Sequence, residues 1–276
     1  MTEQTPKVKP AEGFLARALV RKRREVEAGR RRRPLAELAR AARDRDPARP
    51  WADALRAPGA AVIAEVKRAS PSAGSLAPGV DAAGRARLFE RHGASAVSVL
   101  TDAAFDGRLD DLRAVADAVT IPVLRKDFLV DPWQVWESRA TGADAALVIV
   151  ASLDDAGLTA LADAAREAGL GLLVEIHARE EAARAVALDA DVIGVNARDL
   201  ASLGVDVAAG LGLLRRLRGD APDAVLVAES GIAGPDDVRR AQAAGADAVL
   251  VGEHLARASD PGIALEALVA AGRAEA

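Results

Sequence analysis

Charged side chains stand where short apolar runs of this 276-residue chain end. The polar groups that close five of these runs are Glu65 and Lys67, Arg125 to Asp127, Glu175, Asn196, and Glu229. A single charge at a strand end is often only solvated, but a buried charge without a partner is strongly destabilising. Two lysines and three glutamates that face one cavity can pair and shift one another's pKa. The set therefore predicts general acid–base chemistry near neutral pH without a metal ion.

Eight apolar runs rich in β-branched residues position these side chains. They begin near residues 61, 95, 121, 144, 170, 191, 224 and 247, and helical patterns separate them. Several of these helices end on glycine just before the next run. Runs that are apolar on both faces and alternate with helices predict a parallel sheet covered on both sides. Eight units without a leftover strand favour an α/β fold of one closed (β/α)8 barrel, a TIM barrel, over an open sheet.

Two glycine turns late in the chain indicate a phosphate site. Ser230-Gly231 follows the seventh run, and Gly252-Glu253 follows the eighth, where a short helix is expected to begin. Barrels of this kind often bind phosphate at these two places, through backbone N–H groups and a helix N-terminus. The hydroxyl of Ser70, after the first run, is a candidate for a further donor. One glycine alone would indicate only a turn, so the prediction depends on the pair.

The N-terminal segment has a different pattern. Helical apolar stripes cover residues 11–29 and 35–42, after a tail at 1–10. Gly29 and Pro34 are expected to interrupt the first helix. We therefore expect an N-terminal helical extension, residues 1–50, packed on a barrel domain of residues 51–276.

The basic character of this extension leaves three interpretations open. It holds 15 Lys and Arg against 7 Asp and Glu, with basic runs at 21–24 and 30–33. Such runs are usually a solvated helix face. They can also bind nucleic acid, but no nucleic-acid motif accompanies them and the chain's net charge is −4, so no nucleic-acid partner is expected. In the third interpretation, the helices lie over the barrel mouth and attract an anionic substrate.

Composition excludes several kinds of chemistry. The chain has no cysteine, which removes disulfides, thiolate metal sites and cysteine nucleophiles. His92, His177 and His254 lack ligand spacing, so no metal and no cofactor are predicted and structural roles are expected for all three. No run of about 18 apolar residues and no signal-peptide pattern occurs, so we expect a cytoplasmic protein without a membrane partner. A monomer is favoured, although no residue pattern decides the oligomeric state.

Six motifs resemble those of the indole-3-glycerol-phosphate synthase family. They are AEVKRASPS (64–72), PVLRKDF (122–128), LVEIH (173–177), VIGVNARDL (192–200), AESGI (228–232) and AVLVGE (248–253), in the family's order and spacing. The resemblance implies a (β/α)8 barrel that works without cofactor or metal on an anionic phosphosugar derivative. It implies the decarboxylating ring closure and dehydration of 1-(2-carboxyphenylamino)-1-deoxyribulose 5-phosphate to indole-3-glycerol phosphate in tryptophan biosynthesis. Such a reaction needs one acid for the carbonyl, a base, and a second acid for the departing hydroxyl.

The resemblance also implies a role for each matching residue. Lys126 resembles the general acid on the carbonyl, and Glu175 resembles its partner and base. Lys67 resembles an anchor for the substrate carboxylate and an acid in dehydration, and the division of steps between the lysines stays open. The other implied catalytic positions are Glu65 and Asn196. The implied substrate-binding positions are Ser70, Pro71, Phe128, Leu147, Arg198, Leu200, Leu203 and Glu229, and the implied phosphate-binding positions are Ser70, Ser230, Gly231, Gly252 and Glu253.

One loop departs from the family pattern, and two other functions stay open. Residues 103–109 are shorter than in the family and carry Arg108 where serine is usual, so the resemblance assigns no role to Phe105. An isomerase of phosphoribosyl compounds is the second candidate, but such enzymes typically use a cysteine or aspartate pair rather than two lysines. The third candidate is a non-catalytic binding or scaffold protein, which would bind the ligand without turnover.

Overall fold

The computed structural model describes residues 13–56 and 58–273, so the tail expected at 1–10 and the start of the helix expected at 11–29 lie outside the described residues. Eight parallel strands close into a barrel. They are β1 (Ala61–Val66), β4 (Ala96–Leu100), β5 (Val123–Lys126), β6 (Ala145–Ile149), β7 (Gly171–Ile176), β8 (Val192–Asn196), β9 (Val225–Glu229) and β10 (Ala248–Val251). Because β1 pairs with both β4 and β10, the ring is complete. The prediction of a (β/α)8 barrel is confirmed.

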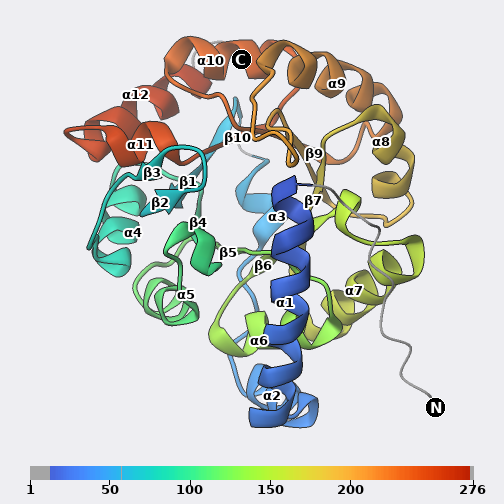
Figure 1. The fold of residues 1–276 in the computed structure, drawn as a ribbon. Helices are drawn as coiled ribbons and strands as arrows, with labels where there is room; N and C mark the ends of the chain where they lie inside the picture. Colours follow the sequence, from blue (N-terminus) through green and yellow to red (C-terminus); the bar gives the residue numbers. More distant parts are fainter. Residues whose placement is uncertain (1–12, 57, 274–276) are drawn as a thin grey trace.

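Helices follow the strands and cover the outside of the barrel (Figure 1). They are α4 (Ala82–Arg91), α5 (Leu109–Ala116), α6 (Pro132–Thr141), α7 (Asp155–Ala168), α8 (Arg179–Val186), α9 (Val207–Asp220), α10 (Pro235–Ala243), α11 (Glu253–Arg257) and α12 (Pro261–Arg273). Gly142 (φ 109°) and Gly169 (φ 62°) end α6 and α7 in the left-handed conformation that glycine adopts without strain. None of the helices in the described part combines the length and the apolar character of a membrane span.

Short elements lie in the loops after three of the strands. A hairpin of β2 (Ala69–Ser70) and β3 (Gly74–Ser75) follows β1, and the sequence patterns did not predict it. The 3-10 turns η1 (Ala103–Phe105) and η2 (Val150–Ser152) follow β4 and β6. These loops all leave the carboxyl ends of strands, which is the end where barrel enzymes hold their sites.

The strands of the barrel are buried on both faces. Every residue of β1, β4, β6 and β9 is buried, in agreement with their apolar sequences. Burial of one large side chain such as Leu124 stabilises the fold by roughly 1.5–3 kcal/mol. Three carboxylates interrupt this apolar core, because Glu65, Glu175 and Glu229 are only 4%, 1% and 2% exposed. Each stands at or near the carboxyl end of its strand, where partners are needed to keep it buried.

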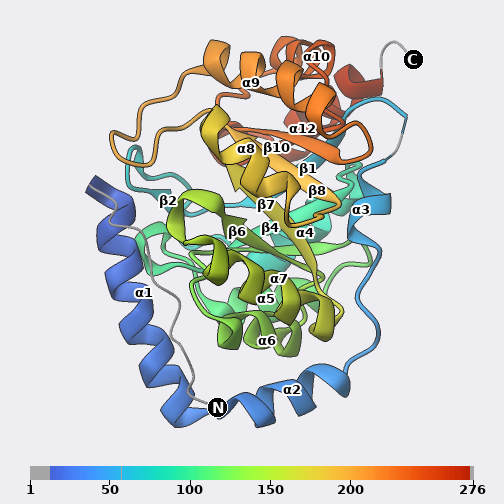
Figure 2. The same ribbon diagram turned by 90° about the vertical axis from the view of Figure 1, so that its right-hand side faces the viewer.

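Three N-terminal helices precede the barrel: α1 (Gly13–Arg32), α2 (Leu35–Arg43) and α3 (Trp51–Ala54). Figure 1 looks along the barrel and shows α1 (blue) across its centre, and Figure 2 shows α1 standing along one end of the barrel, beside β2. The loops that α1 covers are therefore those at the carboxyl ends of the strands. The division into an extension of residues 1–50 and a barrel of residues 51–276 stays a prediction.

The prediction that Gly29 interrupts the first helix is wrong. Helix α1 continues through Gly29 to Arg32 and ends before Pro34. A Cβ on Gly29 would lie 2.4 Å from an atom of the Trp133 ring on α6, so the missing side chain allows the close approach of that ring. Glycine serves packing here rather than helix termination.

Candidate active site

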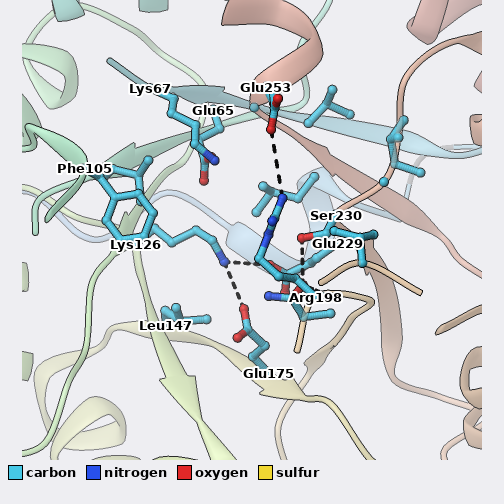
Figure 3. Close-up of a pocket in the computed structure, with 18 of the residues that line it drawn as sticks. Glu65, Lys67, Phe105, Lys126, Leu147, Glu175, Arg198, Glu229, Ser230 and Glu253 are labelled. Atoms are coloured by element: carbon cyan, nitrogen blue, oxygen red, sulfur yellow. Dashed lines mark hydrogen bonds and ion pairs between the residues drawn. The ribbon is translucent and has the colours of Figure 1, made fainter. Parts of the chain in front are cut away.

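A cavity of about 620 Å³ opens at the carboxyl ends of the strands. Side chains from all eight strands reach it, and the loops after them complete its wall (Figure 3). The predicted site residues that line it are Glu65, Lys67, Lys126, Phe128, Leu147, Glu175, Asn196, Arg198, Leu200, Glu229, Ser230, Gly231, Gly252 and Glu253. The barrel thus brings residues from most of the chain to one cavity of a size typical of small-molecule sites.

The ammonium group of Lys126 lies between two carboxylates from other strands. Lys126 ends β5, and its Nζ lies 3.0 Å from Glu175 Oε2 on β7 and 2.6 Å from Glu229 Oε2 on β9 (Figure 3). Burial alone would lower the pKa of Lys126, but the two carboxylates outweigh it and hold that pKa well above its usual value. Lys126 is therefore a charged proton donor fixed at the cavity.

The two carboxylates beside Lys126 have opposite pKa shifts. Burial, reinforced by the charge of Glu175, raises the pKa of Glu229 to about 8, against the attraction of Lys126. Burial acts on Glu175 as well, but the cations of Lys126 and His177 outweigh it and hold the pKa of that carboxyl below its usual range. Two carboxyl groups with pKa values pushed apart in this way are suited to different protonation states at neutral pH.

A second lysine reaches the same cavity beside β1. The Nζ of Lys67 lies 3.5 Å from Glu65 Oε1 and 5.8 Å from the centre of the Phe105 ring. Ser98 of β4 donates a hydrogen bond to Glu65 Oε2 at 3.3 Å. Glu65 and Lys67 reach the cavity together because side chains two residues apart leave a strand on the same side.

Two glycines make room for the buried carboxylates. A Cβ on Gly194 of β8 would lie 2.2 Å from Glu229 Oε1, and a Cβ on Gly252, after β10, would lie 2.3 Å from Glu65 Oε1. Real Cβ atoms do not approach other atoms so closely, so a side chain at either position would displace the carboxylate. Glu229 thus lies against the bare backbone of β8, and Glu65 lies against the bare backbone of the residue that follows β10.

Polar groups gather where β8 and β9 end. The Oδ1 of Asn196 accepts hydrogen bonds from Ser230 Oγ at 2.7 Å and from the backbone N–H of Arg198 at 3.0 Å. Ser230 (φ 67°) and Gly231 (φ 79°) both adopt the left-handed backbone conformation, which is strained for serine. This sharp turn places both residues at the cavity wall.

Arginines surround Glu253 at the start of α11. The Nε of Arg257 lies 3.0 Å from Glu253 Oε1, and the Nη2 of Arg198 lies 4.0 Å from Glu253 Oε2 (Figure 3). Arg198 also donates to the carbonyl of Leu203 at 2.9 Å and to Ser72 Oγ at 3.3 Å. Arg198 therefore connects the loops after β1, β8 and β10 at the rim of the cavity.

Apolar side chains form another part of the wall. Phe105, Phe128, Leu147 and Leu200 line it. Phe14 of α1 packs edge-on against Phe105 and Phe128, with ring centres 6.3 Å and 5.9 Å apart. This wall suits a flat aromatic group, and α1 supports it from behind.

Buried ion pairs tie α1 to the loops beside the cavity. The Nζ of Lys22 lies 2.9 Å from Asp102 Oδ2 and 2.8 Å from Asp127 Oδ1. Arg21 donates to both carboxylate oxygens of Asp102, at 2.6 and 2.8 Å. Because Asp127 directly follows Lys126, α1 helps to fix the end of β5. Two members of the basic run at 21–24 are thus structural ion-pair partners, which is none of the three interpretations that the sequence left open.

Three predicted substrate-binding residues are not among those that line the cavity. Ser70, Pro71 and Leu203 are absent from the residues that line it. The Oγ of Ser70 accepts a hydrogen bond from the backbone N–H of Ala73 at 3.0 Å, Pro71 is exposed, and Leu203 offers its carbonyl to Arg198. Ser70 and Pro71 belong to the hairpin segment after β1, whose conformation the strand pattern did not predict.

Sequence reasoning missed several residues at or beside the site. The cavity is also lined by Asp102, His254 and Arg257, and by Phe105, to which the resemblance assigned no role. His177 does not line it, but its Nε2 lies 3.2 Å from Glu175 Oε1. The available signal was the spacing of two between Glu175 and His177, which places both on one side of the strand end. Within the described residues, no group of three or more His, Asp or Glu side chains is placed to hold a metal ion.

A closed (β/α)8 barrel whose cavity gathers lysines and glutamates at its strand ends is typical of barrel enzymes that use general acid–base catalysis. A family model described as "Indole-3-glycerol phosphate synthase" matches residues 15–268. The chain therefore belongs to the indole-3-glycerol phosphate synthase family, the carboxy-lyases of tryptophan biosynthesis, and the resemblance found in the sequence is confirmed.

Relatives with the same printed name cover most of the chain. The protein of Mycobacterium ulcerans is 52% identical over 79% of this chain and 80% of its own length. That of Mycobacterium avium is 51% identical over 86% and 87%, and that of a Nocardioides species is 54% identical over 82% and 86%. Each of the three is named "Indole-3-glycerol phosphate synthase". The function expected from the sequence is thus confirmed at the level of the family.

Solved structures of other enzymes share the fold. A crystal structure of 3-hexulose-6-phosphate synthase aligns with a TM-score of 0.63 at 19% identity, over 76% of this chain and 99% of that chain. The enzyme of that name from Salmonella typhimurium aligns with a TM-score of 0.60 at 16% identity, over 76% and 97%. At these identities the likeness shows the barrel fold alone.

Proposed function

We propose that this cavity closes the indole ring of indole-3-glycerol phosphate by general acid–base catalysis, with Lys126 as the acid of the first step. The substrate of the family loses one carbon dioxide and one water, which needs no oxidant or reductant. The observation that carries the proposal is the ammonium of Lys126 beside an open cavity, 3.0 Å from Glu175 and 2.6 Å from Glu229. A cation in this place can donate a proton and can be recharged from Glu229, whose raised pKa keeps a proton on that carboxyl.

Ring closure starts at the carbonyl of the open-chain sugar. Lys126 gives its proton to the carbonyl oxygen, and the ring carbon that bears the carboxylate attacks the carbonyl carbon. A carbon–carbon bond forms and the carbonyl oxygen becomes a hydroxyl. The bond to the carboxylate then breaks, carbon dioxide leaves, and the electron pair restores the aromatic ring. Because the positive charge of Lys126 also faces the developing negative charge on that oxygen, it stabilises the transition state electrostatically.

Dehydration needs a second acid and a base. We assign the acid to Lys67, whose Nζ lies 3.5 Å from Glu65 Oε1. The same ammonium group can bind the substrate carboxylate before that group leaves as carbon dioxide. The hydroxyl departs as water with that proton, and the neighbouring carbon loses a proton to Glu175, whose pKa is held below its usual range by Lys126 and His177 against burial. The new double bond completes the indole ring.

The phosphate end of the substrate is anionic and needs hydrogen-bond donors rather than a base. We assign the phosphate to Ser230, Gly231, Gly252 and the backbone N–H of Glu253, which line the cavity together. The carboxylate of Glu253 is turned toward Arg257 and Arg198, so only its backbone is suited to an anion. Two strand-end turns that converge in this way are typical of phosphate sites in barrels.

The anthranilate ring would lie against the apolar wall. Phe128, Leu147 and Leu200 line that wall, with Phe105 in addition. We assign Asn196 to the sugar hydroxyls, since its Oδ1 is occupied by Ser230 and its amide N–H groups are left for substrate. Contacts from Ser70, Pro71 and Leu203 would require the segments after β1 and β8 to move toward the cavity.

A coupled assay tests the proposal. Wild-type protein and the family substrate are expected to release carbon dioxide and form the fluorescent indole product in a ratio of one. A Lys126→Ala variant is expected to form both products at least about 1,000-fold more slowly, while calorimetry still detects substrate binding. Product formation by this variant at the wild-type rate would remove Lys126 from the mechanism. A cytoplasmic location and a monomeric state stay predictions, and gel filtration with light scattering would test the second.

A further inference from the structure

We propose that His177 is a positioning residue that holds the carboxylate of Glu175 against Lys126 from outside the cavity. The inference rests on the proposed role of Glu175 as the base, and it concerns a histidine for which the sequence suggested only an ordinary structural role.

The two oxygens of the Glu175 carboxylate have different cationic partners. Oε2 accepts a hydrogen bond from Lys126 Nζ at 3.0 Å on the cavity side. Oε1 lies 3.2 Å from His177 Nε2 on the other side, in an ion pair whose alignment falls short of a hydrogen bond. With one cation at each oxygen, rotation of the carboxylate away from Lys126 would break two charge contacts at once.

The imidazole itself is held between two carboxylates. His177 follows β7, and Glu181 from α8 accepts a hydrogen bond from the His177 backbone N–H at 2.8 Å while lying 3.8 Å from its Nδ1. Asp199, in the loop after β8, also feels the charge of His177. The ion-pair partners of the ring are therefore Glu175 of β7 and Glu181 of α8, both acidic, and Asp199 of the β8–α9 loop is a further acidic group within electrostatic range.

This acidic surrounding keeps the ring charged. Burial alone would lower the pKa of His177, but Glu175 and Glu181 outweigh it and raise the pKa to about 10. The ring is therefore an imidazolium at neutral pH and favours the ionised form of Glu175.

The second carboxylate at Lys126 shows what the imidazolium contributes. Glu229 contacts the same ammonium and is just as buried, but its Oε1 is buried without a hydrogen-bond partner. Among the residues that the structure describes, its ion-pair partner is Lys126 and no histidine pairs with it. Its pKa is raised by burial to about 8, whereas the pKa of Glu175 is lowered. The imidazolium of His177 lies beside Glu175 but not beside Glu229. It therefore accounts for the difference between Glu175, which is ionised, and Glu229, which keeps its proton.

The experiment compares the pH dependence of turnover in wild type, His177→Gln and a matched control, His92→Gln. His92 also pairs with a glutamate, Glu266, at 2.8 Å, but on α12 and away from the cavity. In H177Q the pKa of Glu175 is expected to rise, so the acidic limb of kcat should move to higher pH by about one unit. On the acidic limb, below the apparent pKa of wild type, we expect kcat to fall up to about tenfold, while kcat at pH 7 stays nearly unchanged and KM stays within about twofold. H92Q is expected to follow the wild-type profile.

A second variant and a measurement without turnover keep the inference testable if H177Q does not fold. Glu181→Gln retains a hydrogen-bond acceptor for the His177 backbone but removes one of the two charges beside the ring. Because the chain has only three histidines, the ring signals that are lost in H92Q and in His254→Gln identify those of His177 by elimination. In wild type they should show a protonated ring at pH 8, and in E181Q the titration should move to lower pH.

The possible failures are distinguishable. No indole product from wild type and H92Q would contradict the proposed function itself. Active wild type together with an unshifted pH profile in H177Q would contradict only the positioning role. A neutral His177 ring at pH 7 in the wild-type NMR spectrum would contradict it as well.

Discussion

The two lysines of the cavity are almost equally shielded from solvent, yet they are held in different ways. Their side chains are 14% exposed for Lys126 and 12% for Lys67. Lys126 reaches across the barrel to carboxylates on β7 and β9, at 3.0 and 2.6 Å. Lys67 stays beside Glu65 on its own strand segment, at 3.5 Å (Figure 3). The difference therefore lies in the partners and not in burial.

This comparison explains how one cavity can hold two acids for two steps. A lysine fixed between two carboxylates keeps its position during the first proton transfer, because moving it would break two short contacts. A lysine with one longer contact can bind the substrate carboxylate first and then serve the departing hydroxyl. Each lysine has a carboxylate partner that packs against a glycine. Glu229, the partner of Lys126, packs against Gly194, and Glu65, the partner of Lys67, packs against Gly252. The following variants test this division, from the largest expected effect to the smallest.

Lys126→Ala should have the largest effect. We expect kcat to fall about 1,000- to 10,000-fold, because the first proton donor is lost and general acid catalysis contributes on this order. Carbon dioxide release and indole formation should decrease together, since both follow ring closure. Stopped-flow fluorescence and trapped carbon dioxide measure the two rates. Carbon dioxide release at a normal rate would show that Lys126 acts after decarboxylation.

Lys67→Ala should separate the two products. We expect indole formation to fall about 100-fold, because the second acid is missing while the first remains. Carbon dioxide should be released faster than indole appears, so that their ratio exceeds one early in the reaction. A ratio of one throughout, as in wild type, would assign Lys67 to binding alone.

Substitution of the two glycines that pack against these carboxylates provides a finer test, with the same ratio of carbon dioxide to indole as the measurement. Gly194→Ala should displace Glu229 from Lys126 and lower kcat about 10- to 100-fold, the scale expected for misplacement by about 1 Å. Its matched partner is Gly252→Ala, which should displace Glu65 and raise the ratio of carbon dioxide to indole instead. Equal ratios of carbon dioxide to indole in the two variants would mean that the Lys126–Glu229 pair and the Lys67–Glu65 pair do not serve different steps.

Glu229→Gln should have the smallest effect, seen in stability. The pKa of Glu229 is about 8 in the folded protein, against an ordinary value of 4.5. Between these values the unfolded chain gives up a proton that the folded chain keeps, so rising pH favours unfolding. Stability from this group is complete below pH 4.5 and is lost as the pH rises through about 8.

The neutral amide avoids this loss. We expect Tm at pH 8 to rise by roughly 2–4 °C in E229Q, the shift that about 1 kcal/mol produces in a domain of this size. At pH 4.5 the two proteins should melt alike. Glu175→Gln is the matched control, because its folded pKa is lowered and the charge is stabilising there. Calorimetry at both pH values measures the shifts, and a lower Tm for E229Q at pH 8 would contradict the raised pKa.

The barrel and the position of the catalytic lysines were predictable from local sequence patterns, but the ion pairs between distant parts of the chain were not. Alternating apolar runs with glycine-ended helices predicted all eight strands, and the motif around Lys126 predicted its place at a strand end. The ion pairs of Lys22 with Asp102 and Asp127 join distant parts of the chain, and no periodic pattern encodes them. The residue type was misleading at Gly29, where glycine admits a tryptophan ring instead of ending a helix.

The contacts of α1 also set an order of assembly. This helix is synthesised before the strands whose loops it covers. Asp102, the partner of Arg21, follows 81 residues after it, and Asp131, which pairs with Arg30 at 2.7 Å, follows 101 residues after Arg30. Contacts of such long separation form late, because the intervening chain must first be organised. We expect α1 to dock after the barrel has closed, so amide protons of α1 should exchange with solvent before those of β4 and β5. The cavity wall behind Phe105 and Phe128 would then be the last part of the protein to mature.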